Sequence, residues 1–236
     1  MKPLLVLAGG FGTRLRAVVS EVPKPLAPVV GHPYLRYLIQ QWRLQGVNDL
    51  VFLLHHQSKM IEAYLNALLD QGEFGECRIS TVTENQPLGT GGAIAHAIQQ
   101  RSLSGSFLVA NADTWLGSGI ARVADAPMPA MAIISVGNTG RYGSVAVEGS
   151  KIVSFSEKKD SQGVGWINAG LYHLEASQFD AWKGGPFSLE QNLFPELVRS
   201  GRLHAVLLET DFIDIGVPED YHRFCRWIES GRSEVL

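Results

Sequence analysis

The sequence predicts an α/β fold in which a mostly parallel sheet carries helices on both of its faces. Apolar runs typical of buried strands recur along the first 113 residues, and an amphipathic helix pattern separates each run from the next. Beyond Asp113 the pattern changes to alternating strands and a hairpin, which is typical of an α+β arrangement. With no internal repeat or low-complexity linker, we expect residues 1–236 to form one domain.

Residues 3–8 form a continuous apolar run that ends at Gly9 and Gly10, as expected of a strand buried on both faces. In residues 33–46, apolar side chains at i, i+3, i+4 and i+7 predict a helix that ends at Gly46. The same alternation continues with strands at 49–55, 78–83 and 106–110 and with helices at 59–69 and 91–100.

The second half is richer in strands. Residues 144–155 predict a hairpin whose tight turn is Gly149-Ser150. Pro218 suits a first helical position and begins the last predicted helix, with a buried stripe of Tyr221, Phe224, Cys225 and Ile228. The remaining predicted elements are strands at 131–136, 166–174 and 203–208 and a helix at 189–199.

Composition excludes several classes of protein. Twenty basic residues against 23 acidic ones give a net charge of −3, and no Lys/Arg run appears, so we expect no nucleic-acid partner. No apolar run approaches the roughly 18 residues of a membrane helix, so we expect a soluble cytoplasmic protein without a membrane partner. Cys77 and Cys225 are too far apart for a zinc site built mainly from thiolates.

The segment Gly9-Gly10-Phe11-Gly12-Thr13-Arg14 directly follows the first predicted strand. Glycines let the backbone approach a ligand, exposed N–H groups in such a turn bind anions, and an arginine can grip phosphate oxygens. The phosphate loop of nucleoside triphosphatases is excluded because Gly-Lys-Ser/Thr is absent. The dinucleotide fingerprint fails because Leu15 stands at its third glycine. The alternative is a purely structural turn.

Lys24 lies between Pro23 and Pro25, and we expect the prolines to hold it in an extended loop as a fixed positive charge. The alternative is an ordinary solvated lysine.

Asp113 follows the fourth predicted strand, at the carboxyl edge of the sheet where α/β proteins bind ligands. Asp214 comes from the far half of the chain, and two such carboxylates over phosphates would hold Mg²⁺.

Taken together, residues 7–15 and 23–25 resemble the signature of the sugar-1-phosphate nucleotidylyltransferases. Four further blocks agree in order: Glu84-x-x-Pro87-Leu-Gly89-Thr-Gly-Gly92, Asn111-Ala-Asp113, Glu157-Lys158 with Asn168-Ala-Gly170, and Asp214-Ile-Gly216. The resemblance runs from Lys2 to about Phe224. It implies a Rossmann-like three-layer α/β/α nucleotidyltransferase fold, related to the GT-A fold, with a mixed, mostly parallel sheet. Its nucleotide-binding half would cover about 1–113, and a more β-rich sugar-binding half about 114–236.

The resemblance also implies a reaction, in which a sugar 1-phosphate attacks the α-phosphorus of a nucleoside triphosphate and pyrophosphate leaves. Arg14 would stabilise the pyrophosphate, Lys24 would lie beside the phosphates, and Lys158 would hold the sugar phosphate. With Asp113, these make up the implied catalytic set, and Asp113 and Asp214 would bind Mg²⁺. The implied nucleotide contacts are Leu7, Ala8, Gly9, Gly10, Gly12, Thr13, Arg14, Glu84, Pro87, Gly89, Thr90 and Asn111. The implied sugar contacts are Tyr142, Gly143, Glu157, Lys158 and Asn168.

Within the family, the resemblance favours the D-glycero-α-D-manno-heptose 1-phosphate guanylyltransferases, in stretches that include Arg141-Tyr142-Gly143 and Phe187-Ser-Leu-Glu190. GTP is the favoured nucleotide, and the Glu84 carboxylate would accept from guanine. Mannose-1-phosphate guanylyl, N-acetylmuramate-1-phosphate uridylyl and glucose-1-phosphate thymidylyl transfer remain as alternatives. A non-catalytic nucleotide-sugar sensor is disfavoured because the charged residues are present. Ala112 departs from the family's usual glycine, and a homodimer is a family-level expectation.

Overall fold

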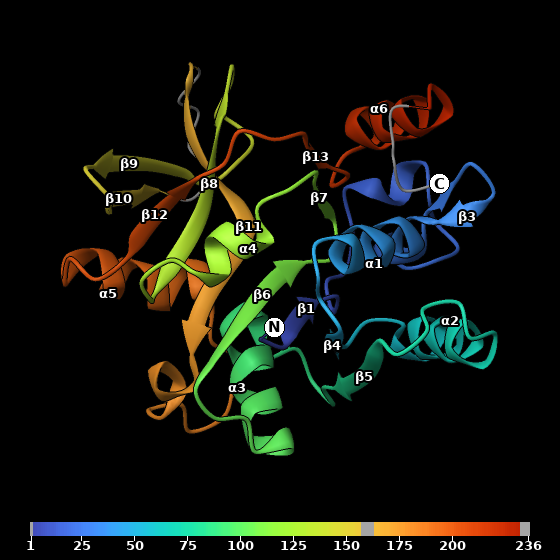
Figure 1. The fold of residues 1–236 in the computed structure, drawn as a ribbon, viewed down its shortest axis with the longest axis horizontal. Helices are drawn as coiled ribbons and strands as arrows, with labels where there is room; N and C mark the ends of the chain where they lie inside the picture. Colours follow the sequence, from blue (N-terminus) through green and yellow to red (C-terminus); the bar gives the residue numbers. More distant parts are fainter. Residues whose placement is uncertain (1, 157–162, 232–236) are drawn as a thin grey trace.

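A computed structural model of the chain describes residues 2–156 and 163–231. Within these residues a nine-stranded mixed sheet runs through the molecule in the order β5-β4-β1-β6-β11-β8-β12-β10-β9 (Figure 1). The first four of these strands are mutually parallel and come from the first half of the chain. They are β5 (Arg78–Thr83), β4 (Asp49–Leu54), β1 (Leu4–Leu7) and β6 (Ser106–Asn111).

The other five strands mix directions. The long strand β11 (Gly165–Glu175) pairs antiparallel with β6 and so joins the two halves of the chain in one sheet. Beyond it lie β8 (Ala130–Val136), β12 (His204–Leu207), β10 (Lys151–Ser156) and β9 (Ser144–Glu148). β12 is parallel to β8, whereas β9 and β10 form the predicted hairpin around Gly149, whose φ is +59°.

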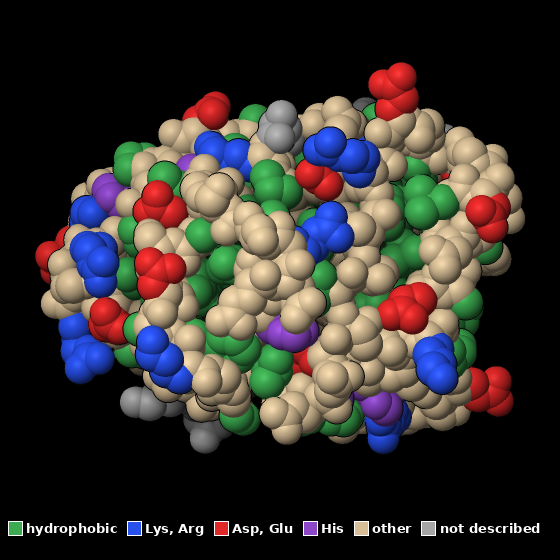
Figure 2. Space-filling view, turned by 90° about the horizontal axis from the view of Figure 1, so that it is seen from below, with side chains coloured by type: hydrophobic (Ala, Val, Ile, Leu, Met, Phe, Trp, Pro, Cys, Tyr) green, Lys and Arg blue, Asp and Glu red, His purple; other side chains and the backbone are tan. Residues whose placement is uncertain are grey.

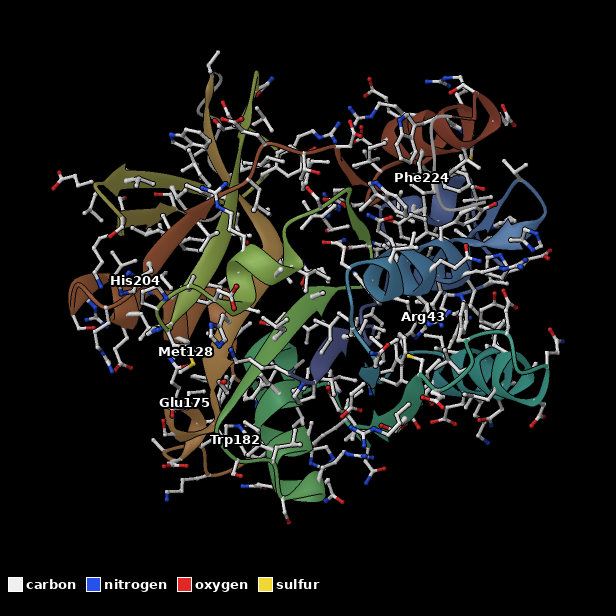
Figure 3. All side chains as sticks on the ribbon, in the orientation of Figure 1. Arg43, Met128, Glu175, Trp182, His204 and Phe224 are labelled. Atoms are coloured by element: carbon white, nitrogen blue, oxygen red, sulfur yellow. The ribbon has the colours of Figure 1, made fainter. Side chains whose placement is uncertain are left out.

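Helices cover both faces of the sheet, each over its own hydrophobic core. One core is covered by α1 (Tyr34–Leu44), α2 (Ser58–Asp70), α4 (Ile120–Ala124) and α6 (Pro218–Glu229). The other is covered by α3 (Gly89–Arg101), the 3₁₀ turn η3 (Ala176–Phe179), the π-helical turn η4 (Leu189–Leu193) and α5 (Phe194–Arg199). In Figure 3, Phe224 lies between α6 and α1, with its ring centroid 4.8 Å from that of Tyr34.

Several short elements were not predicted, since a strand of two or three residues has no periodicity of its own. They are the pairs β2 (Pro28–Val29) with β3 (His32–Pro33) and β7 (Thr114–Leu116) with β13 (Phe212–Asp214), the helix α4, and the 3₁₀ turns η1 (Leu15–Ala17), η2 (Lys24–Leu26) and η3. The β7–β13 pair brings Asp214 beside the end of β6.

Three expectations need correction. Lys24 begins a 3₁₀ turn instead of lying in an extended loop, because Leu26 N–H donates to the Pro23 carbonyl. The helix expected at 189–199 is a π-helical turn followed by a short α-helix. In α6, Cys225 is only half-buried, whereas Asp220 is buried because two arginines pair with it.

Charges are mixed on one face of the molecule. Figure 2 shows basic and acidic side chains interspersed on the face seen from below. No helix among the described residues is both long and apolar enough to cross a membrane.

Candidate functional site

A cavity of about 330 Å³ lies where the carboxyl ends of β1, β4 and β6 meet the start of α3. This is the edge at which α/β sheets bind ligands. Of the predicted nucleotide contacts, those that line it are Leu7, Gly9, Gly10, Glu84, Pro87, Gly89, Thr90 and Asn111, and Asp113 joins them. Ala8 and Gly12 line a smaller adjoining pocket together with Lys24 and Asp113. Thr13 and Arg14 are exposed on the same loop.

The glycine turn is shaped by the residues around it. A β-carbon at Gly9 would lie 3.1 Å from the His55 β-carbon, and one at Gly12 would lie 3.3 Å from the Lys24 β-carbon. Gly12 also has φ +61°, a conformation that side chains disfavour. At Gly10, by contrast, nothing lies within 4 Å of such an atom. The turn thus packs closely against β4 and Lys24 and leaves room on the side of the cavity.

An ion pair stands at one end of the cavity. Lys24 Nζ lies 2.5 Å from Asp113 Oδ2, and the Thr114 hydroxyl donates to Asp113 Oδ1 at 3.2 Å. Burial alone would raise the pKa of Asp113, but the Lys24 ammonium beside it holds that pKa below its usual range. The side chain of Lys24 is only 13% exposed, so this lysine is a fixed charge rather than a solvated one.

Asp214 lies beside this pair. Ile215 N–H donates to the Asp113 carbonyl, and Gly216 N–H donates to Asp214 Oδ1 at 2.7 Å. Burial, and then the Asp113 carboxylate, raise the pKa of Asp214. A β-carbon on Gly216 would lie 2.8 Å from Asp214 Oδ1 and 3.2 Å from Arg14 Nη2. The fold thus brings Arg14, Lys24, Asp113 and Asp214 together.

The two aspartates fit a hard cation that also binds substrate. Among residues 2–156 and 163–231, no group of three or more His, Cys, Asp or Glu side chains could hold a metal. Mg²⁺ is commonly bound by one or two carboxylates, with phosphate oxygens and water supplying the remaining ligands. Asp113 and Asp214, which the bond from Ile215 N–H to the Asp113 carbonyl holds side by side, match that chemistry.

Glu84 lies at the far end of the cavity, where its role is partly structural. Its Oε2 accepts from Leu88 N–H at 2.8 Å, which closes the loop from residue 84 to residue 88. Burial raises the pKa of this carboxyl, and the Leu88 bond opposes that rise. One carboxylate oxygen therefore holds the loop, and among the described residues no hydrogen bond is found to the other oxygen.

The predicted sugar residues are only partly brought together. Asn168 N–H donates to the Gly143 carbonyl at 2.9 Å, and Asn168 Nδ2 donates to the buried Tyr172 hydroxyl at 2.8 Å. Tyr172 in turn interacts with Asn111 of the cavity. Tyr142 instead lines a separate, larger cavity of about 850 Å³, where its ring packs 5.6 Å from that of Phe212.

Two predicted residues, Glu157 and Lys158, lie outside the described part of the chain. The departure at Ala112 has a structural answer. Its φ is not positive, its side chain is 2% exposed in the core, and its N–H donates to the Leu7 carbonyl. The backbone there does not need the conformational freedom of glycine.

Some cavity residues escaped the sequence analysis. They are Phe11, Leu53, His55, Ala93 and Glu190. The half-exposed ring of Phe11, between two glycines of the turn, lies 5.8 Å from that of His55. The sequence alone predicts no role for Glu190, although it ends the stretch Phe187-Ser-Leu-Glu190. Its distance in sequence from α3 concealed a contact that only the fold makes.

Comparisons with known proteins identify the family and the fold. Residues 4–230 match the family model described as nucleotidyl transferase. A D-glycero-alpha-D-manno-heptose 1-phosphate guanylyltransferase of Campylobacter jejuni is 30% identical over 93% of this chain and 97% of its own length. Mannose-1-phosphate guanylyltransferase 1 of Arabidopsis thaliana is 32% identical over 92% of this chain, which spans 62% of that protein. The crystal structure of HddC from Yersinia pseudotuberculosis complexed with GMP-PN superposes with a TM-score of 0.82 at 31% identity, over 97% of this chain and 100% of that one. The expected α/β fold is thereby confirmed.

Proposed function

Because the chain belongs to the nucleotidyl transferase family, we propose that it transfers a guanylyl group from GTP to a sugar 1-phosphate, with D-glycero-α-D-manno-heptose 1-phosphate as the favoured acceptor. The products would be GDP-heptose and pyrophosphate, for bacterial cell-surface polysaccharide. One observation carries the proposal. The cavity runs from a carboxylate and loop suited to a base, at Glu84, to the charged cluster of Lys24, Asp113 and Asp214.

In this reaction an oxygen of the sugar phosphate attacks the α-phosphorus, and the bond from that phosphorus to the pyrophosphate oxygen breaks. Both reactants are anions, so positioning and charge neutralisation supply most of the rate. Lys24 would hold its positive charge beside the α-phosphate. Arg14, which lies next to Asp214, would neutralise the departing pyrophosphate. The glycine turn would let backbone N–H groups contact the phosphates without obstruction.

We include Mg²⁺ in the proposal, bound by Asp113 and Asp214. When bound, it would lower the charge of the phosphates and help to orient them. The Lys24 ammonium beside Asp113 favours the ionised form of that carboxylate, which is the form that binds a cation.

The choice of acceptor rests on similarity. The Campylobacter jejuni relative is named for the heptose and is covered almost completely, which supports the heptose. The Arabidopsis thaliana relative is named for mannose 1-phosphate and is similar to a comparable degree, which makes mannose 1-phosphate the second candidate.

The test is a pyrophosphate-release assay that crosses GTP, UTP, dTTP and ATP with heptose, mannose, glucose and N-acetylmuramate 1-phosphates, with Mg²⁺ and with chelator. We expect the highest kcat/KM for GTP with the heptose phosphate and no turnover in chelator. A clear preference for UTP or dTTP would overturn guanylyl transfer, and a preference for mannose 1-phosphate would overturn the heptose alone.

A further inference from the structure

We infer that Glu190 binds sugar-ring hydroxyls inside the nucleotide cavity, with one carboxylate oxygen fixed by the protein and the other presented to the ligand. The ring is either the ribose of the nucleotide or the acceptor sugar, since both carry neighbouring hydroxyls. The inference rests on the proposed function and assigns a role to a side chain that the mechanism above does not use. Glu190 lines the cavity together with Thr90, Asn111 and Asp113.

The hydrogen bonds around Glu190 show that its carboxylate accepts from two neighbouring hydroxyl groups. Its Oε2 accepts from the Thr90 hydroxyl at 2.6 Å and from the Ser188 hydroxyl at 2.9 Å. The Thr90 oxygen itself accepts from Leu189 N–H, and the Ser188 oxygen accepts from the N–H groups of Glu190 and Gln191. Because backbone donors approach both hydroxyl oxygens, each hydroxyl proton is directed to Glu190. The carboxylate is therefore held as an acceptor.

Both of these bonds end on the same oxygen. Among the described residues, Oε1 of Glu190 accepts no hydrogen bond. The side chain is half-buried and borders the cavity. An ionised carboxylate can accept about four hydrogen bonds, so one fixed oxygen leaves the second available. Hydroxyl groups of a sugar are the donors that fit such an acceptor.

The chain is built to place Glu190 there. Gly91 N–H and Gly92 N–H both donate to the Phe187 carbonyl, at 2.9 and 2.8 Å. A β-carbon at Gly89 would lie 2.8 Å from that oxygen, and one at Gly91 would lie 2.4 Å from the Phe187 ring. Trp182, labelled in Figure 3, donates to the Gly185 carbonyl and steadies the start of the same segment. The glycines of α3 therefore allow residues 185–190 to approach the cavity closely.

The substitution Glu190→Gln distinguishes binding of a ligand by Glu190 from a purely structural role. In Glu190→Gln, the amide oxygen can still accept from Thr90 and Ser188, whereas the group facing the cavity changes from an acceptor to a donor. We expect an unchanged thermal midpoint and a fall in kcat/KM of about 10- to 100-fold, the range for loss of a hydrogen bond to a charged group. Glu196→Gln makes the same change at an exposed position of α5 and should leave both quantities unchanged.

Deoxy substrates identify the ring. If Glu190 binds ribose, the loss caused by Glu190→Gln disappears with 2′-deoxy- or 3′-deoxy-GTP. If it binds the acceptor, the loss persists with those nucleotides and disappears with a deoxy-sugar 1-phosphate. A loss of equal size with every analogue, or a lowered thermal midpoint, would overturn the inference.

Calorimetric binding separates this inference from the proposed function. Wild-type and Glu190→Gln proteins are titrated with GTP, with its deoxy forms and with each sugar phosphate, without turnover. Weakened binding of one fully hydroxylated ligand supports the role of Glu190 even if no pair releases pyrophosphate, a result that would refute the proposed function alone. Equal binding of every ligand by both proteins would refute the role of Glu190.

Discussion

Two glycine-rich segments border the same cavity, and they use their glycines differently. In the first, Gly9 to Gly12, the backbone packs on His55 and Lys24, but Gly10 faces open space on the side of the cavity. In the second, Gly89 to Gly92, the space that side chains would fill is taken by Phe187, whose carbonyl also accepts from two of the backbone N–H groups. The first segment leaves room for a ligand, and the second leaves room for another part of the chain.

The difference bears on how glycine motifs are interpreted. A glycine-rich start of a helix beside a phosphate site suggests anion binding by free N–H groups. In α3 the N–H groups of Gly91 and Gly92 are already bonded within the protein. The charges that would act on phosphates, from Lys24 and Arg14, lie beside the first segment and the two aspartates. The second segment serves the cavity through the side chains it positions.

The largest effect is expected at the charged cluster that lies beside the first segment. Asp113→Asn removes a proposed Mg²⁺ ligand and the partner of Lys24, and we expect kcat to fall by about 10²- to 10³-fold or more. Pyrophosphate release measures this fall, with Asp70→Asn at the exposed end of α2 as the matched control. A wild-type rate in Asp113→Asn would contradict the metal assignment.

A pair of alanine substitutions tests the comparison itself. Gly10→Ala adds a methyl group where nothing lies within 4 Å, so stability should change by less than about 0.5 kcal/mol. The methyl group takes ligand space, and we expect KM for GTP to rise about 10-fold or more.

Gly91→Ala should instead lower the stability of the protein. Its β-carbon would overlap the Phe187 ring, and such overpacking costs about 1–3 kcal/mol, which outweighs the gain of about 0.5–1 kcal/mol from replacing glycine in a helix. Thermal and urea unfolding of both variants measure the contrast. A stabilised Gly91→Ala protein, or an unstable Gly10→Ala protein, would contradict the distinction between the two segments.

The two segments also show which features could be predicted from the sequence and which could not. The long strands and helices were predictable because each carries its own periodicity, as in β5, which was predicted with its observed bounds. Asp113 and Lys24 could be proposed as site residues from their local neighbours. The contact of Phe187 with Gly91 and the position of Glu190 could not, because about a hundred residues separate the partners and no local pattern encodes their approach.

The smallest effect concerns Glu84, at the opposite end of the cavity from Asp113. Glu84→Gln keeps an oxygen for Leu88 N–H but replaces the remaining acceptor with a donor. If that acceptor contacts guanine, the preference for GTP over the other nucleotides should fall about tenfold, near the value of one hydrogen bond. An unchanged order of preference among the nucleotides would contradict the contact with guanine. Glu84 would then keep only its structural role in the bond to Leu88 N–H.

The pH dependence of stability tests the structural role of Glu84 by itself, because it needs no nucleotide. Burial raises the pKa of Glu84, so between the ordinary pKa of a glutamate and this raised value the folded protein holds a proton that the unfolded chain has released. Wild-type stability should therefore decline relative to Glu84→Gln as pH rises through that interval, and the difference should be smallest at low pH. Unfolding midpoints of both proteins across the acid range measure this. A wild-type protein that instead gains stability relative to the variant with rising pH would show that the Leu88 bond outweighs burial.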